Sequence, residues 1–334
     1  MKISATIITG FLGAGKTTLI RHLLRNSNGA RIALIINEFG SLGVDKEIIN
    51  GSEKQSCKLE SIVELANGCI CCTVSDDFLP TIEALLEHPE PPEHIIIEAS
   101  GLALPKSLIQ AFNWPEVRSR VAVNGVVAVV DGPAVNSGLF ADNVEEMKFK
   151  KNVDQVLNHD NPLQEVFEDQ LFCADIVVLN KSDLLNENGL TSVHALLKEA
   201  VKSGVKVIPA IRGEIDTKVI LGLENLMPSH VEDELPHHDH DEFESFVVNL
   251  DTVDDPKLLE ERIAATASFH NILRIKGFIE IVGKDMRHVI QAVGSRIERY
   301  YDRPWRKVEN RKSALVVIGQ TGLDRVAIER ALRG

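Results

Sequence analysis

The 334-residue sequence lacks two features: an uninterrupted apolar run long enough to cross a membrane, and an excess of positive charge. A membrane span needs about 18 or more apolar residues, so none is expected. The formal net charge of −13 argues against general nucleic-acid binding. The first ten residues contain no apolar stretch followed by a small-residue cleavage site. Export is therefore not expected, and a cytoplasmic location is.

Cysteine is scarce and unevenly placed. The chain has five cysteines, and three of them, Cys69, Cys71 and Cys72, fall within four positions. An odd number in a chain that is not expected to be exported makes a poor disulfide framework, and it indicates reduced thiols with a metal or catalytic role. Small cysteines that fill a core are the alternative, and this interpretation is favoured for the isolated Cys57 and Cys173.

The cysteine cluster has the chemistry of a transition-metal site, because soft thiolates favour Zn²⁺ and other late transition metals. Cys69 and Cys71 can point the same way from an extended segment, whereas the adjacent Cys71 and Cys72 rarely bind one ion without a sharp bend. We therefore expect two or three cysteine ligands, completed by histidine, carboxylate or water. Such an incomplete set suits a site that releases its metal, since sites closed by four protein ligands tend to be structural.

Charge divides the chain into two parts. Residues 243–334 carry 16 Lys and Arg against 13 Asp and Glu, whereas residues 1–242 carry 20 against 36. The change falls at an acidic, histidine-rich stretch that is nearly free of apolar residues and cannot form a core. We expect a first domain over residues 1–229, a linker over residues 230–242 and a second domain over the remainder.

The first domain alternates short apolar, β-branched segments with helix-like segments, which predicts an α/β fold with a mostly parallel, doubly wound sheet. The expected strands are Ile3–Ile8, Arg31–Ile36, His94–Ile97, Asn124–Val130, Asp175–Leu179 and Val205–Ile208. The expected helices are Lys16–Arg25, Asp76–Glu87, Lys106–Phe112, Leu163–Phe172 and Ser192–Val201. Ligands of such sheets bind at the carboxyl ends of the strands.

The second domain is expected to be a smaller α+β module. Its expected strands are Phe243–Leu250, Ile272–Ile281 and Ala314–Ile318. Its expected helices are Asp255–Ser268, Arg287–Tyr300 and Asp324–Leu332. This part of the sequence contains no recognisable chemical motif.

The segment from Gly10 to Thr18 matches the phosphate-loop pattern G-x-x-x-x-G-K-[ST], between a predicted strand and a predicted helix. Its backbone N–H groups and the positive end of the helix are expected to bind phosphate. Lys16 is expected to reach the β- and γ-phosphates as a catalytic residue, and the Thr17 hydroxyl to bind Mg²⁺. The expected phosphate-binding residues are Gly10, Gly13, Ala14, Gly15, Lys16, Thr17 and Thr18. The pattern predicts a P-loop NTPase; a glycine-rich turn before an ordinary helix is the alternative.

The segment Asn180-Lys181-Ser182-Asp183 follows another apolar strand and has the pattern N-K-x-D. The Asp183 carboxylate can accept two hydrogen bonds from guanine, and adenine lacks that donor pair. The stem of Lys181 can lie over the base, and Asn180 can tie the loops together. Behind a phosphate loop, this pattern predicts GTP and GDP as ligands. A polar loop that caps the next helix is the alternative.

Two further candidates follow the strand expected at residues 94–97. Glu98 is placed to hold Mg²⁺ or its water as a further catalytic residue. Gly101 is placed to approach the γ-phosphate and report its loss. The alternative for Glu98 is a strand-end carboxylate that caps the next helix.

Two other segments carry candidate metal ligands. In the loop after the second expected strand, Glu38 is a candidate to contact Mg²⁺, the attacking water or a transferred metal, and Asp45 is a weaker candidate. Either is equally compatible with a solvated loop carboxylate. His237, His238 and His240 form a tract of a type that binds late metals loosely, and a merely solvated linker explains them equally well.

These motifs together resemble the CobW-type P-loop GTPases, which are associated with metal-centre biosynthesis. The resemblance extends over essentially the whole chain. It rests on Gly10–Thr18, Asn37–Gly40, Glu64–Leu65, Asn67–Cys72, Glu98–Pro105, Asn180–Asp183, the histidine-rich linker and the C-terminal domain. Within the family, the chain is most similar to the branch of aerobic cobalamin biosynthesis, by Ala111–Pro115, Phe167–Leu171 and Asp239–Phe243.

The resemblance implies a cytoplasmic GTPase that serves as a metallochaperone. Binding of Mg²⁺ and GTP would help assemble a high-affinity site at Cys69, Cys71 and Cys72, with Glu38 as a switch residue and further ligand. Hydrolysis to GDP and phosphate would release the ion to a client. The implied ion is Co²⁺ and the implied client is the cobalt chelatase of the corrin pathway. A monomer or a nucleotide- or metal-dependent dimer is expected.

The sequence departs from the family pattern at two places. Ala99 stands where the family often has a hydroxyl residue, so any role of that hydroxyl is missing. After the strand that ends near Ile208, the segment Ala210–Gly213 stands where a loop of small residues usually backs the guanine. The base contacts at that point are therefore left open.

Three alternatives remain for the function. The first is a zinc chaperone of the same family that serves another metalloenzyme, because thiolates bind Zn²⁺ more tightly than Co²⁺ by the Irving–Williams order. A metal buffer or sensor without productive GTP turnover is the second, and it would bind metal equally with GDP and GTP. The third is a GTPase that activates an enzyme by conformational change alone, for which the three clustered cysteines would be dispensable.

Metal uptake by the cysteine cluster should release protons. Thiols have an ordinary pKa of about 8.5 and must lose their protons to become ligands. A titration with Zn²⁺ or Co²⁺ in a pH-stat at pH 7 should therefore consume base. Metal binding without proton release would contradict thiolate ligation.

Overall fold

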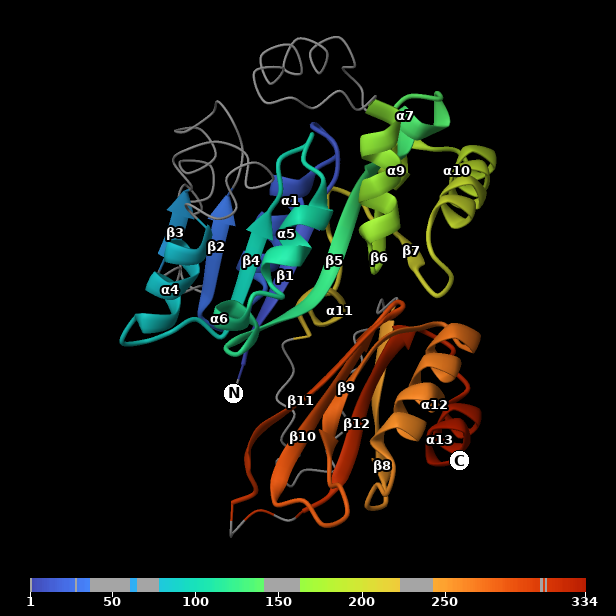
Figure 1. Ribbon diagram of the computed structural model, residues 1–334. Helices are drawn as coiled ribbons and strands as arrows, with labels where there is room; N and C mark the ends of the chain where they lie inside the picture. The colour runs from blue at the N-terminus through green and yellow to red at the C-terminus, as the bar shows by residue number, and fades with distance from the viewer. Residues whose placement is uncertain are drawn as a thin grey trace. The chain divides into compact units, whose positions relative to one another are not determined.

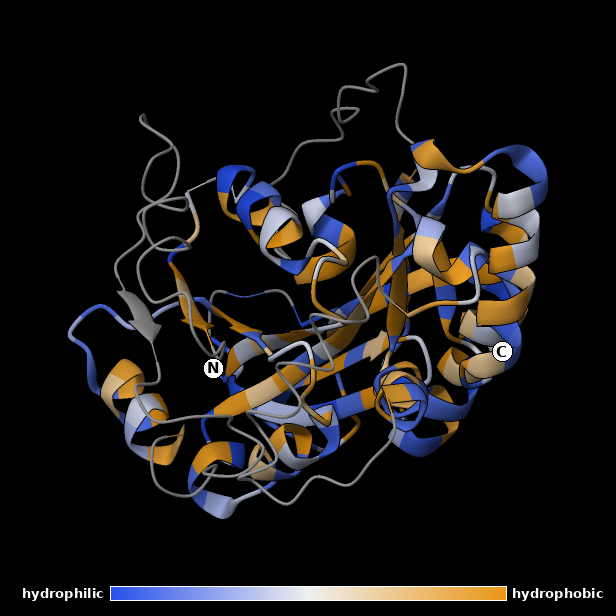
Figure 2. Ribbon diagram, turned by 90° about the horizontal axis from the view of Figure 1, so that it is seen from above, coloured by the Kyte–Doolittle hydropathy of each residue, from blue (hydrophilic) through white to orange (hydrophobic). Residues whose placement is uncertain are grey.

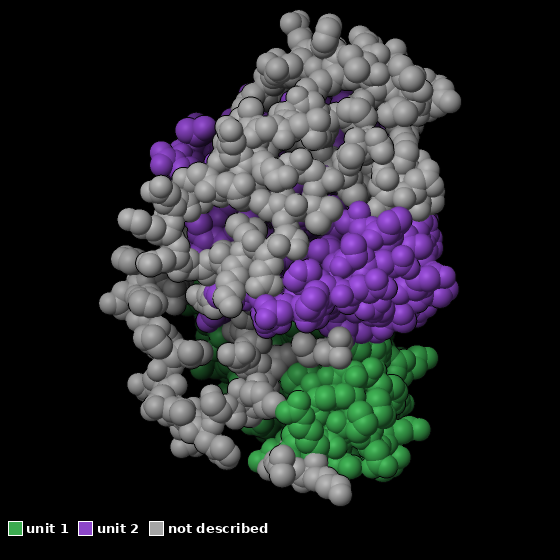
Figure 3. All heavy atoms as spheres, turned by 90° about the vertical axis from the view of Figure 1, so that its left-hand side faces the viewer, with its two compact units in different colours: residues 1, 222–334 green, residues 2–221 purple. Residues whose placement is uncertain are grey.

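The computed structural model describes residues 2–27, 29–36, 61–64, 78–140, 163–222, 243–306, 309 and 311–334. They form two compact units, residues 2–221 and residues 222–334 (Figure 3). Among these described residues, no helix has the length and apolar character that crossing a bilayer requires.

The N-terminal unit is built on a seven-stranded parallel sheet with the strand order β3-β2-β4-β1-β5-β6-β7 (Figure 1). The strands are β1 (Ile3–Thr9), β2 (Ile32–Ile36), β3 (Ser61–Glu64), β4 (His94–Glu98), β5 (Val121–Asp131), β6 (Ile176–Asn180) and β7 (Lys206–Pro209). Every residue of β2, β4, β5 and β6 is buried, as expected for parallel strands covered on both faces. Most of these strands are coloured as hydrophobic in Figure 2. The predicted fold class is confirmed.

Helices connect the strands and cover both faces of this sheet (Figure 1). They are α1 (Lys16–Arg25), α4 (Leu79–Glu87), α5 (Pro105–Ala111), α6 (Pro115–Arg118), α7 (Gly132–Asn136), α9 (Leu163–Cys173), the 3₁₀ helix η3 (Ser182–Leu184), α10 (Glu187–Ala200) and α11 (Thr217–Leu221). Apolar side chains of α4 to α6 and of α9 and α10 pack on the sheet through two hydrophobic clusters. Helix α1 is tied to the segment that precedes α11, because His22 Nε2 lies 2.9 Å from the carbonyl oxygen of Ile215.

Most expected elements of this unit are observed with shifts of a few residues at their ends. The helix expected from Ser192 begins at Glu187, because Oδ1 of Asn186 accepts a hydrogen bond from the N–H of Gly189 at 2.8 Å and caps it. Strand β3 and the short helices α6, α7 and α11 are not anticipated by the sequence analysis. The part of the expected helix 76–87 that precedes Phe78 lies outside the described residues.

The C-terminal unit is a five-stranded antiparallel sheet in the order β11-β10-β9-β12-β8. Its elements are β8 (Phe243–Leu250), α12 (Pro256–Phe269), β9 (Ile272–Ile279), β10 (Met286–Val293), β11 (Arg296–Pro304), β12 (Ser313–Gln320) and α13 (Arg325–Arg333). Leu259 and Ile263 of α12 and Ile328 of α13 pack in one cluster with side chains of the sheet. The expected α+β character is observed.

The helix expected over Arg287–Tyr300 is wrong, because this segment forms the hairpin of β10 and β11. Seven consecutive residues of β10, from Arg287 to Val293, are buried, whereas a surface helix buries only one stripe of side chains. The two residues Gly294 and Ser295 connect the strands, which is the commonest length of a hairpin turn. The β-branched residues of β10 satisfy both a helical and an extended pattern, so their spacing misled the prediction.

Charged side chains are paired at the end of this hairpin. Two N–H groups of Arg303 donate to the carboxylate of Glu309, each at 2.7 Å, and Arg287 donates to the same carboxylate at 3.3 Å. Arg287 also forms an ion pair with Asp302, and their side chains are only 5% and 0% exposed. The hydrogen bonds from Arg303, assisted by the backbone N–H of Arg306, lower the pKa of Glu309 to about 2.

The C-terminal unit should therefore lose stability in acid through Glu309. Its pKa is depressed from 4.5, so its contribution is present above about pH 4.5 and is lost as the pH falls through about 2. We expect Glu309→Gln to have a lower free energy of unfolding than wild type at pH 7. Between pH 4.5 and 2 this free energy should fall less in the variant than in wild type. Urea unfolding followed by the fluorescence of the buried Trp305 measures this, with the exposed Glu261→Gln as control. Identical pH profiles for Glu309→Gln and wild type would contradict it.

Candidate nucleotide-binding site

The loop between β1 and α1 turns through positive φ angles at three glycines. The values are 135° at Gly10, 78° at Gly13 and 104° at Gly15. A Cβ atom at Gly15 would lie 2.1 Å from Nδ2 of Asn180, so glycine is required there by both conformation and space. Helix α1 begins at the next residue, Lys16, and its free N–H groups continue those of the loop. This geometry is that of an anion site at a helix N-terminus.

The side chain of Lys16 extends across the loop toward Phe11. This side chain is buried, with the residue 4% exposed, and Nζ donates to the carbonyl oxygen of Phe11 at 3.2 Å. Phe11 is itself fixed by ring contacts with Phe140 and Phe167, at centroid distances of 6.0 and 5.8 Å. The ammonium group is therefore held over the loop, where phosphate oxygens would offer it further acceptors.

Thr17, in the first turn of α1, and Glu98, the last residue of β4, are brought together. Strand β4 pairs with β1, and the hydroxyl of Thr17 donates to Oε1 of Glu98 at 3.0 Å. Glu98 is 2% exposed, and the adjacent Ala99 donates its N–H to the carbonyl of Ile8 at 2.8 Å. A hydroxyl and a carboxylate are the hard oxygen donors that Mg²⁺ prefers, so the residues present fit this ion. Thr18 is exposed on the first turn of α1.

Asn180, the last residue of β6, ties the phosphate loop to two other segments. Its Nδ2 donates to the carbonyl oxygen of Ala14 at 2.8 Å, and its Oδ1 accepts from the N–H of Gly213 at 2.9 Å. Asn180 is only 2% exposed. A buried amide with both ends paired fixes the distance between the segments that it joins, as the sequence analysis expected of this residue.

The loop after β7 is fastened to the same segment. The backbone N–H and the hydroxyl of Ser182 both donate to the carbonyl oxygen of Ala210, at 3.1 and 3.0 Å. Arg212 has a φ of 52°, which is unusual for a residue other than glycine. The segment 210–213, left open by the sequence analysis, therefore lies beside the N-K-x-D segment.

Lys181 and Asp183 differ in their surroundings. Lys181 has a φ of 57°, and its Nζ forms an ion pair with the buried Asp131 at the end of β5. Asp183 is exposed in η3, so its carboxylate is open to a ligand. The carboxylate of Asp183, proposed to bind the base, is thus exposed, whereas Lys181 is held by Asp131. Asp131 was missed by the sequence analysis, although a buried run ending in an acid was visible there.

Gly101 lies directly against the phosphate loop. A Cβ atom at this position would be 2.8 Å from the backbone nitrogen of Leu12. The turn that contains Gly101 is held by α9, because Nε2 of Gln170 donates to the carbonyl oxygens of Gly101 and Ala103 at 3.2 and 3.3 Å. Gln170 is 1% exposed. This role is not predictable from the sequence, in which only the position of Gln170 in a helix is readable.

Several predicted site residues lie outside the described residues: Glu38, Asp45, Cys69, Cys71, Cys72, His237, His238 and His240. The same holds for Cys57, which was interpreted as a core cysteine. Their assignments stay predictions. Within the part of the chain that the structure describes, no group of three or more His, Cys, Asp or Glu side chains is arranged to hold a metal. The half-buried thiol of Cys173 lies 3.9 Å from Oδ2 of Asp169.

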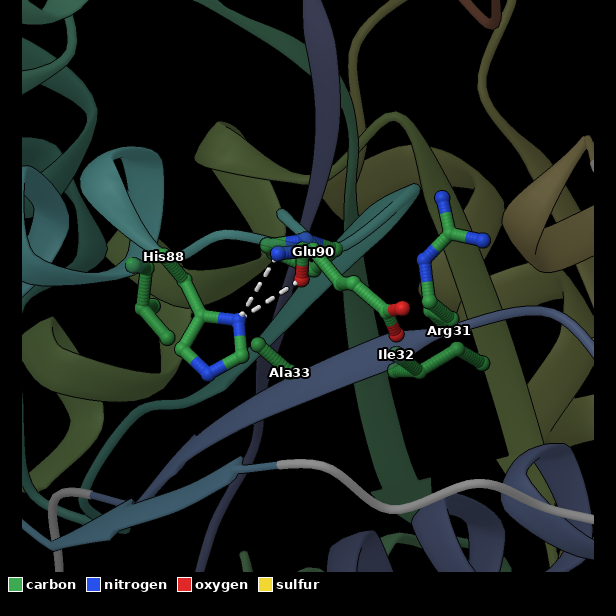
Figure 4. Close-up of a pocket in the computed structure, with 7 residues that line it drawn as sticks. Arg31, Ile32, Ala33, His88 and Glu90 are labelled. Atoms are coloured by element: carbon green, nitrogen blue, oxygen red, sulfur yellow. Dashed lines mark hydrogen bonds between the residues drawn. The ribbon is translucent and has the colours of Figure 1, made fainter.

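A separate pocket lies beside the start of β2 (Figure 4). It is lined in part by Arg31, Ala33, His88 and Glu90, and the N–H of Glu90 donates to Nδ1 of His88 at 3.2 Å. This is the amino end of the strand, opposite to the end at which Glu98 closes β4. Because the phosphate loop follows the carboxyl end of β1, this pocket does not belong to the nucleotide site.

The fold and the site together define a P-loop GTPase. The model of the CobW/HypB/UreG nucleotide-binding domain matches residues 4–209, and that of the "Cobalamin synthesis protein cobW C-terminal domain" matches residues 243–334. The chain therefore belongs to the CobW/HypB/UreG family, which confirms the predicted resemblance.

Similar proteins cover nearly the whole chain. Proteins named "Zinc chaperone CobW" from Sinorhizobium sp and Pseudomonas aeruginosa are 49% and 46% identical, over 99% of this chain and 96% and 91% of theirs. "Zinc chaperone YjiA" from Escherichia coli is 30% identical over 95% of this chain and 94% of its own. The crystal structure of Zn(II)-bound YjiA GTPase covers all of both chains at 25% identity, with a TM-score of 0.43.

Replacement of Gln170 should loosen the turn at Gly101. In Gln170→Leu two backbone carbonyls lose their donor, which should lower the free energy of unfolding by about 1–3 kcal/mol. Affinity for a non-hydrolysable GTP analogue should fall about fivefold, more than affinity for GDP, because Gly101 faces the loop that binds the terminal phosphates.

Isothermal titration with each nucleotide measures this effect, and urea unfolding measures the stability. The matched control is Gln164→Leu on the same helix, whose exposed side chain donates to Glu168 at 2.9 Å. Equal losses for GDP and the GTP analogue would contradict a role at the γ-phosphate side.

Proposed function

We propose that this protein is a GTP-hydrolysing metallochaperone of the cytoplasm that carries Zn²⁺ and releases it to a metalloenzyme client. The proposal rests on the observation that one chain combines an arrangement suited to phosphate and base with a cluster of three cysteines. Matches over 99% of the chain to proteins named as zinc chaperones support it.

The described residues divide the work of nucleotide binding among them. Lys16 neutralises the β- and γ-phosphates once its ammonium group exchanges the carbonyl of Phe11 for phosphate oxygens. Thr17 and Glu98 would hold Mg²⁺, which would supply positive charge at the phosphates. Asp183 accepts the two donors of guanine, and Lys181 covers the base. Adenine is rejected because it leaves the carboxylate without its donor pair.

The strand ends support a link between nucleotide and cargo. Ile8, Glu98, Ile36 and Glu64 occupy one row across β1, β4, β2 and β3. In the sequence, Glu38 follows closely after β2 and the cysteine cluster follows after β3. The strands that precede these proposed ligands thus end level with Glu98. We propose that γ-phosphate binding at Gly101 and Glu98 raises metal affinity, and that hydrolysis lowers it.

Zinc is the preferred cargo for two reasons. Thiolates favour Zn²⁺ over Co²⁺, and relatives at 46–49% identity are named for zinc. Co²⁺ is the second candidate, with cobalt chelatase as its client. It is favoured by the C-terminal match, whose family is described as a cobalamin synthesis protein. The cobalt expectation of the sequence analysis stays a prediction.

Metal affinity should depend on the bound nucleotide. A competitive titration with Zn²⁺ and Co²⁺ is made first with Mg²⁺–GDP and then with Mg²⁺ and a non-hydrolysable GTP analogue. The analogue should raise metal affinity by about 5- to 150-fold, the usual range of coupling between two sites. By linkage, metal should raise the affinity for the analogue by the same factor. Absorption bands of the Co²⁺ form report the number of thiolate ligands.

Three variants make the result specific. Cys71→Ser should lose most of the metal affinity, whereas Cys173→Ser, a thiol at the end of α9, should behave as wild type. Lys16→Ala should keep basal metal binding and lose its dependence on the GTP analogue. Equal metal affinity with GDP and the analogue would indicate a buffer or sensor and contradict the chaperone. Unchanged metal binding in Cys71→Ser would favour a GTPase that acts by conformational change alone.

A further inference from the structure

Asp131 is a second buried acid at the carboxyl ends of the strands. It is the last residue of β5, which pairs with β1 on the side opposite to β4. Its side chain is 0% exposed. The strand on each side of β1 thus ends in a buried carboxylate, Glu98 on one side and Asp131 on the other. Glu98 bonds to Thr17, so the place of a magnesium ligand is taken by Glu98.

The two oxygens of Asp131 have different partners. Oδ1 accepts from the backbone N–H of Ala134 at 3.1 Å and caps α7. Oδ2 forms an ion pair with Nζ of Lys181, the lysine of the N-K-x-D segment. The first bond is an ordinary helix cap. The second joins β5 to the base-binding segment across 50 positions of sequence.

The backbone of Lys181 directs its side chain to this partner. Its φ and ψ are 57° and 32°, a left-handed conformation that is costly for lysine. The preceding residue, Asn180, is in register with Asp131 across β5 and β6. A strained backbone at a functional position persists only where the surrounding structure holds it. Here β6 holds the residue before Lys181, and Asp131 holds the end of its side chain.

We infer that Asp131 is a positioning residue for guanine recognition, which sets the stem of Lys181 in place before the nucleotide arrives. The inference rests on the proposed function, because it assumes that Lys181 covers the base. A lysine stem that is already ordered loses little conformational freedom on binding, so more of its contact with the base appears as affinity. The carboxylate also keeps the ammonium charge beside the base and away from solvent.

Asp131→Asn separates the two tasks of the side chain. Asparagine keeps an Oδ1 acceptor for the N–H of Ala134, so the cap of α7 is retained, but it has no charge for Lys181. We expect the Kd for GDP to rise roughly five- to tenfold, the factor for immobilising one long side chain on binding. Lys181→Met, which keeps an aliphatic stem without charge, should lose affinity as well.

The decisive measurement is a double-mutant cycle. The Kd for GDP is measured by isothermal titration for wild type, Asp131→Asn, Lys181→Met and the double variant. If Asp131 acts through Lys181, its replacement should change the Kd less than about twofold in the Lys181→Met background, because the partner is already gone. If Asp131 were purely structural, its replacement would raise the Kd for GDP by the same factor in both backgrounds.

Two further variants keep the test sharp. Asp175→Asn is the matched control, since Asp175 is another buried carboxylate between β5 and β6 and accepts from the N–H of Val126 at 2.9 Å. It should lower stability without changing the Kd for GDP. Asp131→Glu keeps the charge at a different length and should give an intermediate Kd, which tests the role even if Asp131→Asn folds poorly.

The outcomes separate this inference from the proposed function. A wild-type protein that binds ADP as tightly as GDP would overturn guanine recognition and the role of Asp131 with it. A guanine-selective wild type would support the proposed function. The positioning role alone is overturned if Asp131→Asn then binds GDP as tightly as wild type does. It is also overturned if the substitution lowers GDP affinity by the same factor in the wild-type and Lys181→Met backgrounds.

Discussion

The side-chain amide of Asn180 is the contact on which the nucleotide site depends. One buried amide holds the carbonyl of Ala14 in the phosphate loop and the N–H of Gly213 in the loop after β7. Both ends are satisfied away from water, where an unpaired polar group is costly. The phosphate side and the base side of the site are therefore parts of one arrangement, and neither loop can shift without breaking a buried hydrogen bond.

The position of β1 between β4 and β5 divides the site chemically. Each neighbouring strand ends in a buried carboxylate, and the two acids face different partners: Glu98 meets the hydroxyl of Thr17, and Asp131 meets the ammonium of Lys181. Under the proposed function, the residues for Mg²⁺ and the residues for the base thus come from opposite sides of the same strand.

The sequence predicted the parts of this molecule that depend on local pattern. The phosphate loop and its helix were placed because glycines, Lys16 and Thr17 are adjacent in the chain. The pairing of Asp131 with Lys181 and of Gln170 with Gly101 spans 50 and 69 positions, so it depends on strand order and helix placement that no local pattern contains. The hairpin over residues 287–300 was mistaken for a helix because buried β-branched residues satisfy both periodicities. Strand β3 was missed because four residues are too short to show a period.

The contact between Gly101 and Leu12 brings two backbones together without a side chain between them. Side chains at most loop contacts change rotamer and absorb small displacements. Here nothing of that kind is available, so a movement of the turn after β4 is passed to the phosphate loop with almost no slack. The same stiffness extends to α9, because Gln170 of that helix donates to the carbonyl oxygens of Gly101 and Ala103.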